Sequence, residues 1–304
     1  MKYLGPFLAL LLGACQSMPP PPDPQRPAEM HIATPFFPQQ DYQCGPAALA
    51  TILGWAGEDV DDQMLVDEVW LPERRGSLAI ELVAAARARG KLVYPIDTPI
   101  ALFAALDNEQ PVLVLQNLAL ERWPRWHFAV VTGYRDAGRT IVLNSDVRES
   151  LAMHWNRFVR TWARARYQGW LILPAGELPD AAQPLPLVRA LNELETSTGA
   201  TAAAPFWSAA AARFADDYLV QFGYGNHLWS THQRYEAIEA FRAATRTRPG
   251  AHAGWHNLIT ALIETGQTDA ACEILRDALT QVEDSAQLYS LRERLGQQSS
   301  STCH

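Results

Sequence analysis

Residues 35–50 read PFFPQQDYQCGPAALA and bring one cysteine, Cys44, to the point where an extended, proline-punctuated segment gives way to a helical pattern. The helix is expected because good helix formers follow, with an apolar stripe at Leu49, Ile52 and Leu53. Unpaired N–H groups at a helix start favour thiolate over thiol, so we expect Cys44 to be a better nucleophile than an ordinary cysteine. The alternative is a small buried cysteine at a helix cap, the usual structural role of a free cysteine.

Composition limits the class of protein. The chain has 304 residues and is 48% hydrophobic, which suffices for two ordinary domains that each bury a core. Its formal net charge is -8, and no basic stripe is available to neutralise phosphates. A general nucleic-acid binder is therefore excluded.

The four cysteines, Cys15, Cys44, Cys272 and Cys303, have neither paired spacing nor a Cys-x-x-Cys signature. We therefore expect no disulfide framework and no zinc site. Cys272 lies in an apolar helical pattern and is expected in a core. The histidine pair in HAGWH (residues 252–256) has a metal-capable spacing, but the glutamate of the zincin motif is absent. The sequence thus predicts neither a metal nor a cofactor.

The N-terminus has the features of an export signal. Residues 1–14 combine an early lysine with an apolar run that is too short to span a bilayer, which predicts a signal peptide. The string LGAC, ending at Cys15, resembles a bacterial lipobox, and the resemblance implies acyl chains on Cys15 that anchor the protein. A plain signal peptide with an accidental cysteine is the alternative. Gln16 favours the outer membrane, facing the periplasm, by resemblance to known lipoproteins, and the proline-rich residues 15–29 are predicted to be a tether.

Residues 30–175 show helical patterns first and short apolar strands later, an order typical of an α+β domain with an antiparallel sheet. His127 begins the strand candidate WHFAVVTGY and shares one face of it with Ala129 and Val131. A core histidine satisfied by a hydrogen bond is the alternative to a catalytic one.

Polar residues near this strand complete a set of groups that can activate a thiol. The partner strand ends in Asn-Ser-Asp, where Asp146 is the first candidate to orient an imidazole and Asn144 the second. The order cysteine, histidine and Asn or Asp is that of a nucleophile, its base and an orienting group in acyl transfer. A side-chain amide upstream of the cysteine would donate to the developing oxyanion together with the cysteine N–H, and the candidates are Gln39 and Gln40.

Three blocks in this order, PFFPQ with CGPAALA, HFAVVTGY and IVLNSD, resemble the double-glycine leader (bacteriocin-processing) peptidase family, which has a papain-like fold. The resemblance implies that Cys44 is the nucleophile, His127 the base and Gln39, after its PFFP run, the oxyanion donor. The family usually has Asp followed by Pro at the third position. Here the matching place reads Asn-Ser-Asp, so the orienting residue is expected to be Asp146, with Asn144 next.

The second half is predicted to be all-helical. Prolines in residues 176–186 indicate a linker, residues 187–296 carry a 34-residue repeat typical of tetratricopeptide units, and residues 297–304 are predicted to be a disordered tail. Helical hairpins without repeat ancestry are the alternative. Stacked repeats offer a concave surface to a protein partner. The repeat spacing relates Ala237, Phe241 and Ala244 to Ala271, Leu275 and Ala278.

These features predict a lipid-anchored periplasmic cysteine peptidase that hydrolyses peptide bonds, with helical repeats that recruit a substrate or a partner. The expected partners are a peptide or protein substrate, an unknown protein at the repeats, and the membrane through the lipid. One alternative is an inactive, peptide-binding scaffold, which the irregular third position favours. Another is a cell-wall endopeptidase or amidase, which the Cys-Gly-Pro-Ala context fits less well.

Overall fold

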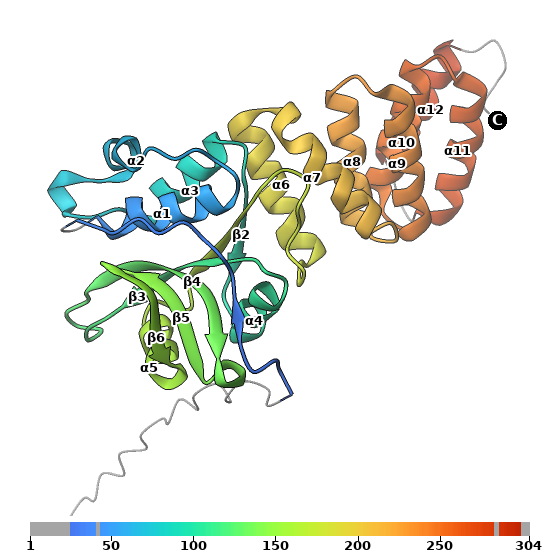
Figure 1. Cartoon of the computed structure of the whole chain (residues 1–304). Coiled ribbons are helices and arrows are strands. Elements are labelled where there is room, and N and C mark those ends of the chain that lie inside the picture. Colours follow the sequence, from blue (N-terminus) through green and yellow to red (C-terminus); the bar gives the residue numbers. More distant parts are fainter. Residues whose placement is uncertain (1–24, 41–42, 283–285, 299–304) are drawn as a thin grey trace, which may run out of the picture.

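The computed structural model describes residues 25–40, 43–282 and 286–298, and Figure 1 shows an N-terminal part built on a sheet and a C-terminal part built of helices. Within the described residues, seven strands form one sheet in the order β2-β7-β3-β4-β5-β6, with β1 paired to β4, and all pairs are antiparallel. The predicted α+β domain followed by an all-α region is confirmed. The strands are β1 (Met30–His31), β2 (Leu92–Ile96), β3 (Val112–Asn117), β4 (Trp126–Arg135), β5 (Thr140–Ser145), β6 (Arg148–His154) and β7 (Gly169–Leu173).

Strand β4 lies at the centre of the sheet and contributes to the cores on both of its faces. Ala129 and Val131 belong to one core, and Phe128 and Val130 belong to the other. Successive side chains of a strand point to opposite faces, so an almost continuous apolar run is expected where both faces are covered. His127 precedes this run, near the start of the strand.

Three helices cover the face that carries Phe128 and Val130 (Figure 1). The first buries the stripe of Leu49, Ile52 and Leu53 against the sheet, as its spacing predicts. The three helices are α1 (Cys44–Trp55), α2 (Asp62–Val69) and α3 (Ala79–Ala88). The 3-10 turn η1 (Pro72–Arg74) lies between α2 and α3 in the chain.

Two further helices cover the opposite face of the sheet. On α5, the rings of Trp155, Phe158 and Trp162 follow one another at centroid distances of 6.0 and 5.6 Å. Trp155 also packs 5.3 Å from Phe103 of α4, so the two helices share one aromatic cluster. The elements here are α4 (Pro99–Asp107), the short turn η2 (Asp136–Gly138) and α5 (Trp155–Ala163).

Helix α6 (Pro184–Thr198) joins the helical part to the sheet. Its apolar positions Leu187, Leu191 and Leu194 are buried in the same core as the strand residues, and the helix contacts β2 and α3. It begins inside the segment expected to be a linker, and Leu178 of that segment packs against this core. The connection is therefore packed, because its apolar side chains find room beside β2.

Helices α7 to α12 continue from α6, each in contact with the next (Figure 1). The six residues related by the predicted 34-residue spacing are all buried. Gly225 allows close packing, because a Cβ there would lie 2.5 Å from the Phe241 ring. The helices are α7 (Ala200–Arg213), α8 (Tyr218–Ser230), α9 (Arg234–Thr247), α10 (His252–Glu264), α11 (Thr268–Gln281) and α12 (Ala286–Gln298).

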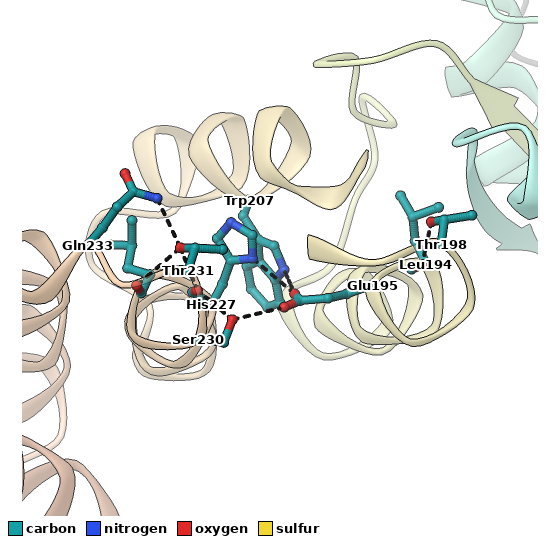
Figure 2. Close-up of polar contacts among 9 residues, drawn as sticks. Leu194, Glu195, Thr198, Trp207, His227, Ser230, Thr231 and Gln233 are labelled. Atoms are coloured by element: carbon teal, nitrogen blue, oxygen red, sulfur yellow. Dashed lines mark hydrogen bonds and ion pairs between the residues drawn. The ribbon is translucent and has the colours of Figure 1, made fainter. Parts of the chain in front are cut away.

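A partly buried polar network ties helices α6, α7 and α8 together (Figure 2). The Glu195 carboxylate on α6 accepts a hydrogen bond from Trp207 Nε1 of α7 at 2.7 Å. The same oxygen lies 3.1 Å from Nδ1 of His227 on α8, whose side chain is buried. Shared partners of this kind fix the angle between helices better than apolar contacts alone. The helices next to the sheet are therefore held as one unit.

The predicted signal peptide and the lipidation residue Cys15 lie outside the described residues. In the described end of the tether, Arg26 pairs with Asp107 and lies 4.2 Å from the Phe103 ring, so this end packs on α4. The expected tail starts inside α12, which ends at Gln298, and its remaining residues are not described. No helix of the described residues is long and apolar enough to cross a membrane.

The cysteines differ from the sequence expectation in one respect. Cys272 on α11 is disulfide-bonded. The wide spacing of the cysteines gave no sign of this bond. Among the described residues, Cys44 is the free cysteine.

Candidate active site

Cys44 is the first residue of α1, and its half-buried thiol lies in the seam between that helix and β4. The backbone N–H groups of Cys44, Gly45 and Phe128 hydrogen-bond to the sulfur. Because Phe128 directly follows His127, these bonds hold the thiol beside the strand that carries the predicted base. Gly45 is required by close packing, since a Cβ there would lie 2.5 Å from Ser77 Oγ.

Burial raises the pKa of the Cys44 thiol above its ordinary value, and the N–H groups around the sulfur offset only part of this effect. The sequence predicts the opposite direction, because a helix start favours a thiolate. Burial dominates because the charged sulfur would lose its hydration in the seam. Cys44 is therefore a thiol at neutral pH and needs a base for attack.

His127 lies at the start of β4 and is 8% exposed. Its Nε2 lies 2.8 Å from Ser145 Oγ at the end of β5. Burial, together with the nearby charges of Arg125 and Arg148, lowers the pKa of His127 to about 4, although Asp146 acts in the opposite direction. The imidazole is therefore neutral at pH 7, as a general base must be.

The two residues expected to orient His127 have other partners. Asn144 Nδ2 donates to Thr34 Oγ1 at 3.0 Å, and Asn144 Oδ1 accepts from Ser150 N at 3.0 Å. Asn144 is paired with Val130 and shares its face, whereas the next residue along β5 points to the other side. That alternation gives Ser145, the middle member of the Asn-Ser-Asp trio, the hydrogen bond to the imidazole.

Asp146 connects the histidine region to the predicted oxyanion donor. Its Oδ1 accepts from Gln39 Nε2 at 3.0 Å, and its backbone carbonyl accepts from Gln39 N at 3.3 Å. Gln39 is half-buried, whereas Gln40 is exposed and its carbonyl accepts from Gln43 N. Of the two candidate glutamines, Gln39 is the one that the fold directs into the site.

Cys44 and His127 line two adjoining cavities. A shallow one surrounds Cys44, and a larger one of about 870 Å³ lies beside His127. Both are lined by Gln39, Ser145 and Asp146, which therefore connect them. Among the described residues no hydrogen bond joins the thiol to the imidazole, and Nδ1 of His127 has no hydrogen-bond partner there.

Residues 31–170 match the model of the Peptidase_C39 like family, and residues 228–295 match a tetratricopeptide repeat. The chain carries a C39-like peptidase domain. Tetratricopeptide repeats follow this domain, as the sequence predicts. No curated protein gives a significant match.

Three solved structures are similar to the C39-like domain. A double-glycine motif protease from an AMS/PCAT transporter, in complex with a leader peptide, is 21% identical with a TM-score of 0.39, over 48% of this chain and 94% of that chain. A C39-like peptidase from Bacillus anthracis is 15% identical, with a TM-score of 0.40 and coverage of 48% and 97%. The peptidase domain of Streptococcus ComA, a bifunctional ABC transporter of a quorum-sensing pathway, is 24% identical, with a TM-score of 0.39 and coverage of 46% and 97%.

Sequence reasoning missed two features of the C39-like domain. The first is Ser145 as the partner of His127. Side chains alternate between the two faces of β5, and this alternation, taken with the face on which His127 lies, is the signal that points to Ser145. The second is the backbone N–H of Phe128, which donates to the Cys44 sulfur. A main-chain donor carries no side-chain signal, so only the fold reveals it.

Proposed function

We propose that this protein is a lipid-anchored periplasmic cysteine peptidase that hydrolyses peptide bonds through a Cys44 acyl-enzyme. One observation carries the proposal: the thiol at the start of α1 is held against the backbone next to His127 within a C39-like domain. The tetratricopeptide repeats are proposed to recruit a substrate or a partner protein.

The proposed reaction begins with two neutral groups. With its proton on Nε2, donated to Ser145 Oγ, the His127 ring keeps a lone pair on Nδ1 that accepts the Cys44 proton. The sulfur then attacks the carbonyl carbon, and the N–H of Cys44 and the amide of Gln39 donate to the oxyanion. The protonated ring gives its proton to the leaving amine, and water, deprotonated by the same ring, hydrolyses the thioester.

A second candidate function is an inactive, peptide-binding domain. It is favoured by the raised pKa of Cys44, the lowered pKa of His127 and the absence, among the described residues, of a hydrogen bond between them. If the site is active, binding of a substrate has to bring the Cys44 thiol and Nδ1 of His127 together. Catalytic hydrogen bonds often tighten in this way only in the substrate complex.

Comparing the N-termini of periplasmic proteins from cells with wild-type or Cys44→Ala protein separates the two candidates. For a peptidase, we expect a set of N-termini that appears only with the wild type, because cleavage needs the thiol. Indistinguishable sets, with both proteins expressed equally, would contradict the peptidase and leave the binding domain.

The lipid anchor is proposed from the LGAC string, which ends at Cys15. We expect the wild type to fractionate with membranes and to take up labelled palmitate. Cys15→Ser should lose both properties, because the sulfur that carries the acyl chain is gone. Cys44→Ser is the matched control and should behave like the wild type. Membrane association and palmitate labelling that survive in Cys15→Ser would refute the anchor.

A further inference from the structure

A buried glutamine, Gln116, lies beside the proposed base and has no part in the proposed reaction. The antiparallel register places it on β3 directly opposite His127 of β4. Residues that oppose each other in this way point to the same face, and their Cβ atoms lie about 4.5–5.5 Å apart. Both residues line the cavity of about 870 Å³ that α5 also borders. Gln116 is fully buried, so its amide lies where electrostatic interactions are stronger than in water.

The orientation of the Gln116 amide is fixed by Thr161 on α5. Thr161 Oγ1 donates its single hydrogen to Phe158 O at 2.7 Å, so toward Gln116 this oxygen can only accept. Gln116 Nε2 is the donor, at 2.6 Å from Thr161 Oγ1. The nitrogen of the amide is therefore held at α5, and the oxygen is left for another role.

This amide oxygen has nothing to accept from. Gln116 Oε1 is buried and has no hydrogen-bond partner among the described residues. A buried acceptor without a partner lowers stability, because the water that hydrates it in the unfolded chain is lost on folding. The residue directly opposite, His127, is the one that becomes positively charged in the proposed reaction.

The protonated form of His127 needs stabilisation that a carboxylate usually supplies. In a Ser-His-Asp triad, the aspartate stabilises the imidazolium. Here Nε2 of His127 lies against the neutral hydroxyl of Ser145. Asp146 favours the protonated ring by its charge, but burial, Arg125 and Arg148 oppose it and keep the pKa low. A further group that favours the positive ring would therefore help the transfer of the thiol proton.

We propose that Gln116 is a positioning residue of the base: the free, negative end of its amide dipole stabilises the positive His127 ring that forms when Cys44 gives up its proton. The inference rests on the proposed function. The proton moves from the Cys44 sulfur to Nδ1 of His127, and Gln116 itself exchanges no proton. Because Thr161 holds the amide before the charge appears, the dipole needs no reorganisation at that moment.

The rate of covalent adduct formation at Cys44 in the full-length protein tests the inference. The probe is a short peptide that carries a vinyl sulfone after a Gly-Gly pair, and the adduct is quantified by peptide mass spectrometry at several pH values. In Gln116→Met, we expect the rate at neutral pH to fall about tenfold and the pH profile to shift to higher pH, because the thiolate–imidazolium pair is less populated. Gln116→Glu keeps an oxygen at this position and should react at least as fast as the wild type.

Gln110→Met is the matched control. Gln110 is also buried, donates from Nε2 to Leu178 O at 3.1 Å, and has an Oε1 without a partner among the described residues. It precedes β3, at the opposite end of that strand from Gln116. Its substitution therefore disturbs a similar buried amide away from the base, and it should leave both the rate and the pH profile unchanged.

His127→Ala separates a failure of this inference from a failure of the proposed function. If His127→Ala reacts as fast as the wild type, the ring is not the base, and the proposed function fails together with the inference. If His127→Ala is slow but Gln116→Met reacts like the wild type, the inference alone is overturned. An equal loss in Gln110→Met, or a Gln116→Glu variant as slow as Gln116→Met, would also overturn it.

Discussion

Replacing Cys44 with alanine should reduce peptide hydrolysis to the uncatalysed background, a loss of about ten-thousand-fold or more. Without sulfur no acyl-enzyme forms, and neither His127 nor Gln39 can replace the nucleophile. The measurement is the rate of cleavage of a Gly-Gly-containing peptide library by the purified full-length protein, read by mass spectrometry. The fold should be retained, because the thiol is only half-buried and its partners are backbone N–H groups.

Cys44→Ser is the control for shape at this position. It keeps a small side chain that accepts from the same N–H groups, but a hydroxyl is a weaker nucleophile than a thiol. We expect activity close to that of the alanine variant and an unchanged melting temperature. Cleavage at the wild-type rate by either variant would mean that another group attacks the substrate.

Replacing His127 with alanine should lower kcat by about one-hundred- to ten-thousand-fold. Burial keeps the Cys44 thiol protonated at neutral pH, so attack depends on a base beside it. The measurement is the pH profile of kcat for the wild type and the variant. In the variant, the residual rate should rise steadily with pH, as hydroxide replaces the imidazole. A variant with wild-type kcat at neutral pH would contradict the assignment of the base.

Comparing Ser145→Ala with Asp146→Asn identifies the partner of the base. Ser145→Ala removes the 2.8 Å contact to Nε2 of His127. We expect kcat to fall roughly tenfold, because the ring loses one hydrogen bond that fixes its orientation. Asp146→Asn keeps the shape next to Gln39 and should act less on kcat. If Asp146→Asn lowers kcat more than Ser145→Ala does, Asp146 is the orienting residue, as the sequence predicts.

The pH dependence of the free energy of unfolding tests whether His127 is buried and neutral in the folded protein. Its pKa is about 4 in the folded protein and near 6.5 when unfolded, so between these values the unfolded state binds the extra proton. The free energy of unfolding should therefore fall by about 3 kcal/mol as the pH drops from 6.5 to 4. His127→Ala should lack this part of the decrease, and denaturant unfolding at several pH values measures it.

The positions of the proposed nucleophile, Cys44, and the proposed base, His127, could be predicted from local patterns. A cysteine before an apolar helical stripe and a histidine at the start of a buried strand each depend on neighbours in sequence, and both lie where their periodicity predicts. The partner of His127 depends instead on which face of β5 meets β4. A shift of one residue on a strand changes the face, so the match to a family pattern favoured Asp146 and Asn144 rather than Ser145.

The pKa of Cys44 could not be predicted in the same way, nor could the packing of the connection between the C39-like domain and the helical part. Whether N–H groups or burial dominates at the sulfur depends on the packing of α1 against β4, which no local pattern measures. Likewise, residues 176–186 contain the prolines of a linker, but their apolar side chains meet the core beside β2. The sequence identifies such side chains but not the surface that covers them.

The most direct test of the central claim is covalent labelling of Cys44 at neutral pH. A peptide that carries a thiol-directed electrophile after its Gly-Gly pair is incubated with the full-length protein, and the modified residue is located by peptide mass spectrometry. If Cys44 is an activated nucleophile, the wild type should form an adduct at Cys44, His127→Ala should form it much more slowly, and Cys44→Ala should form none. Equal labelling of the wild type and Cys44→Ala, or equal rates in the wild type and His127→Ala, would contradict the account.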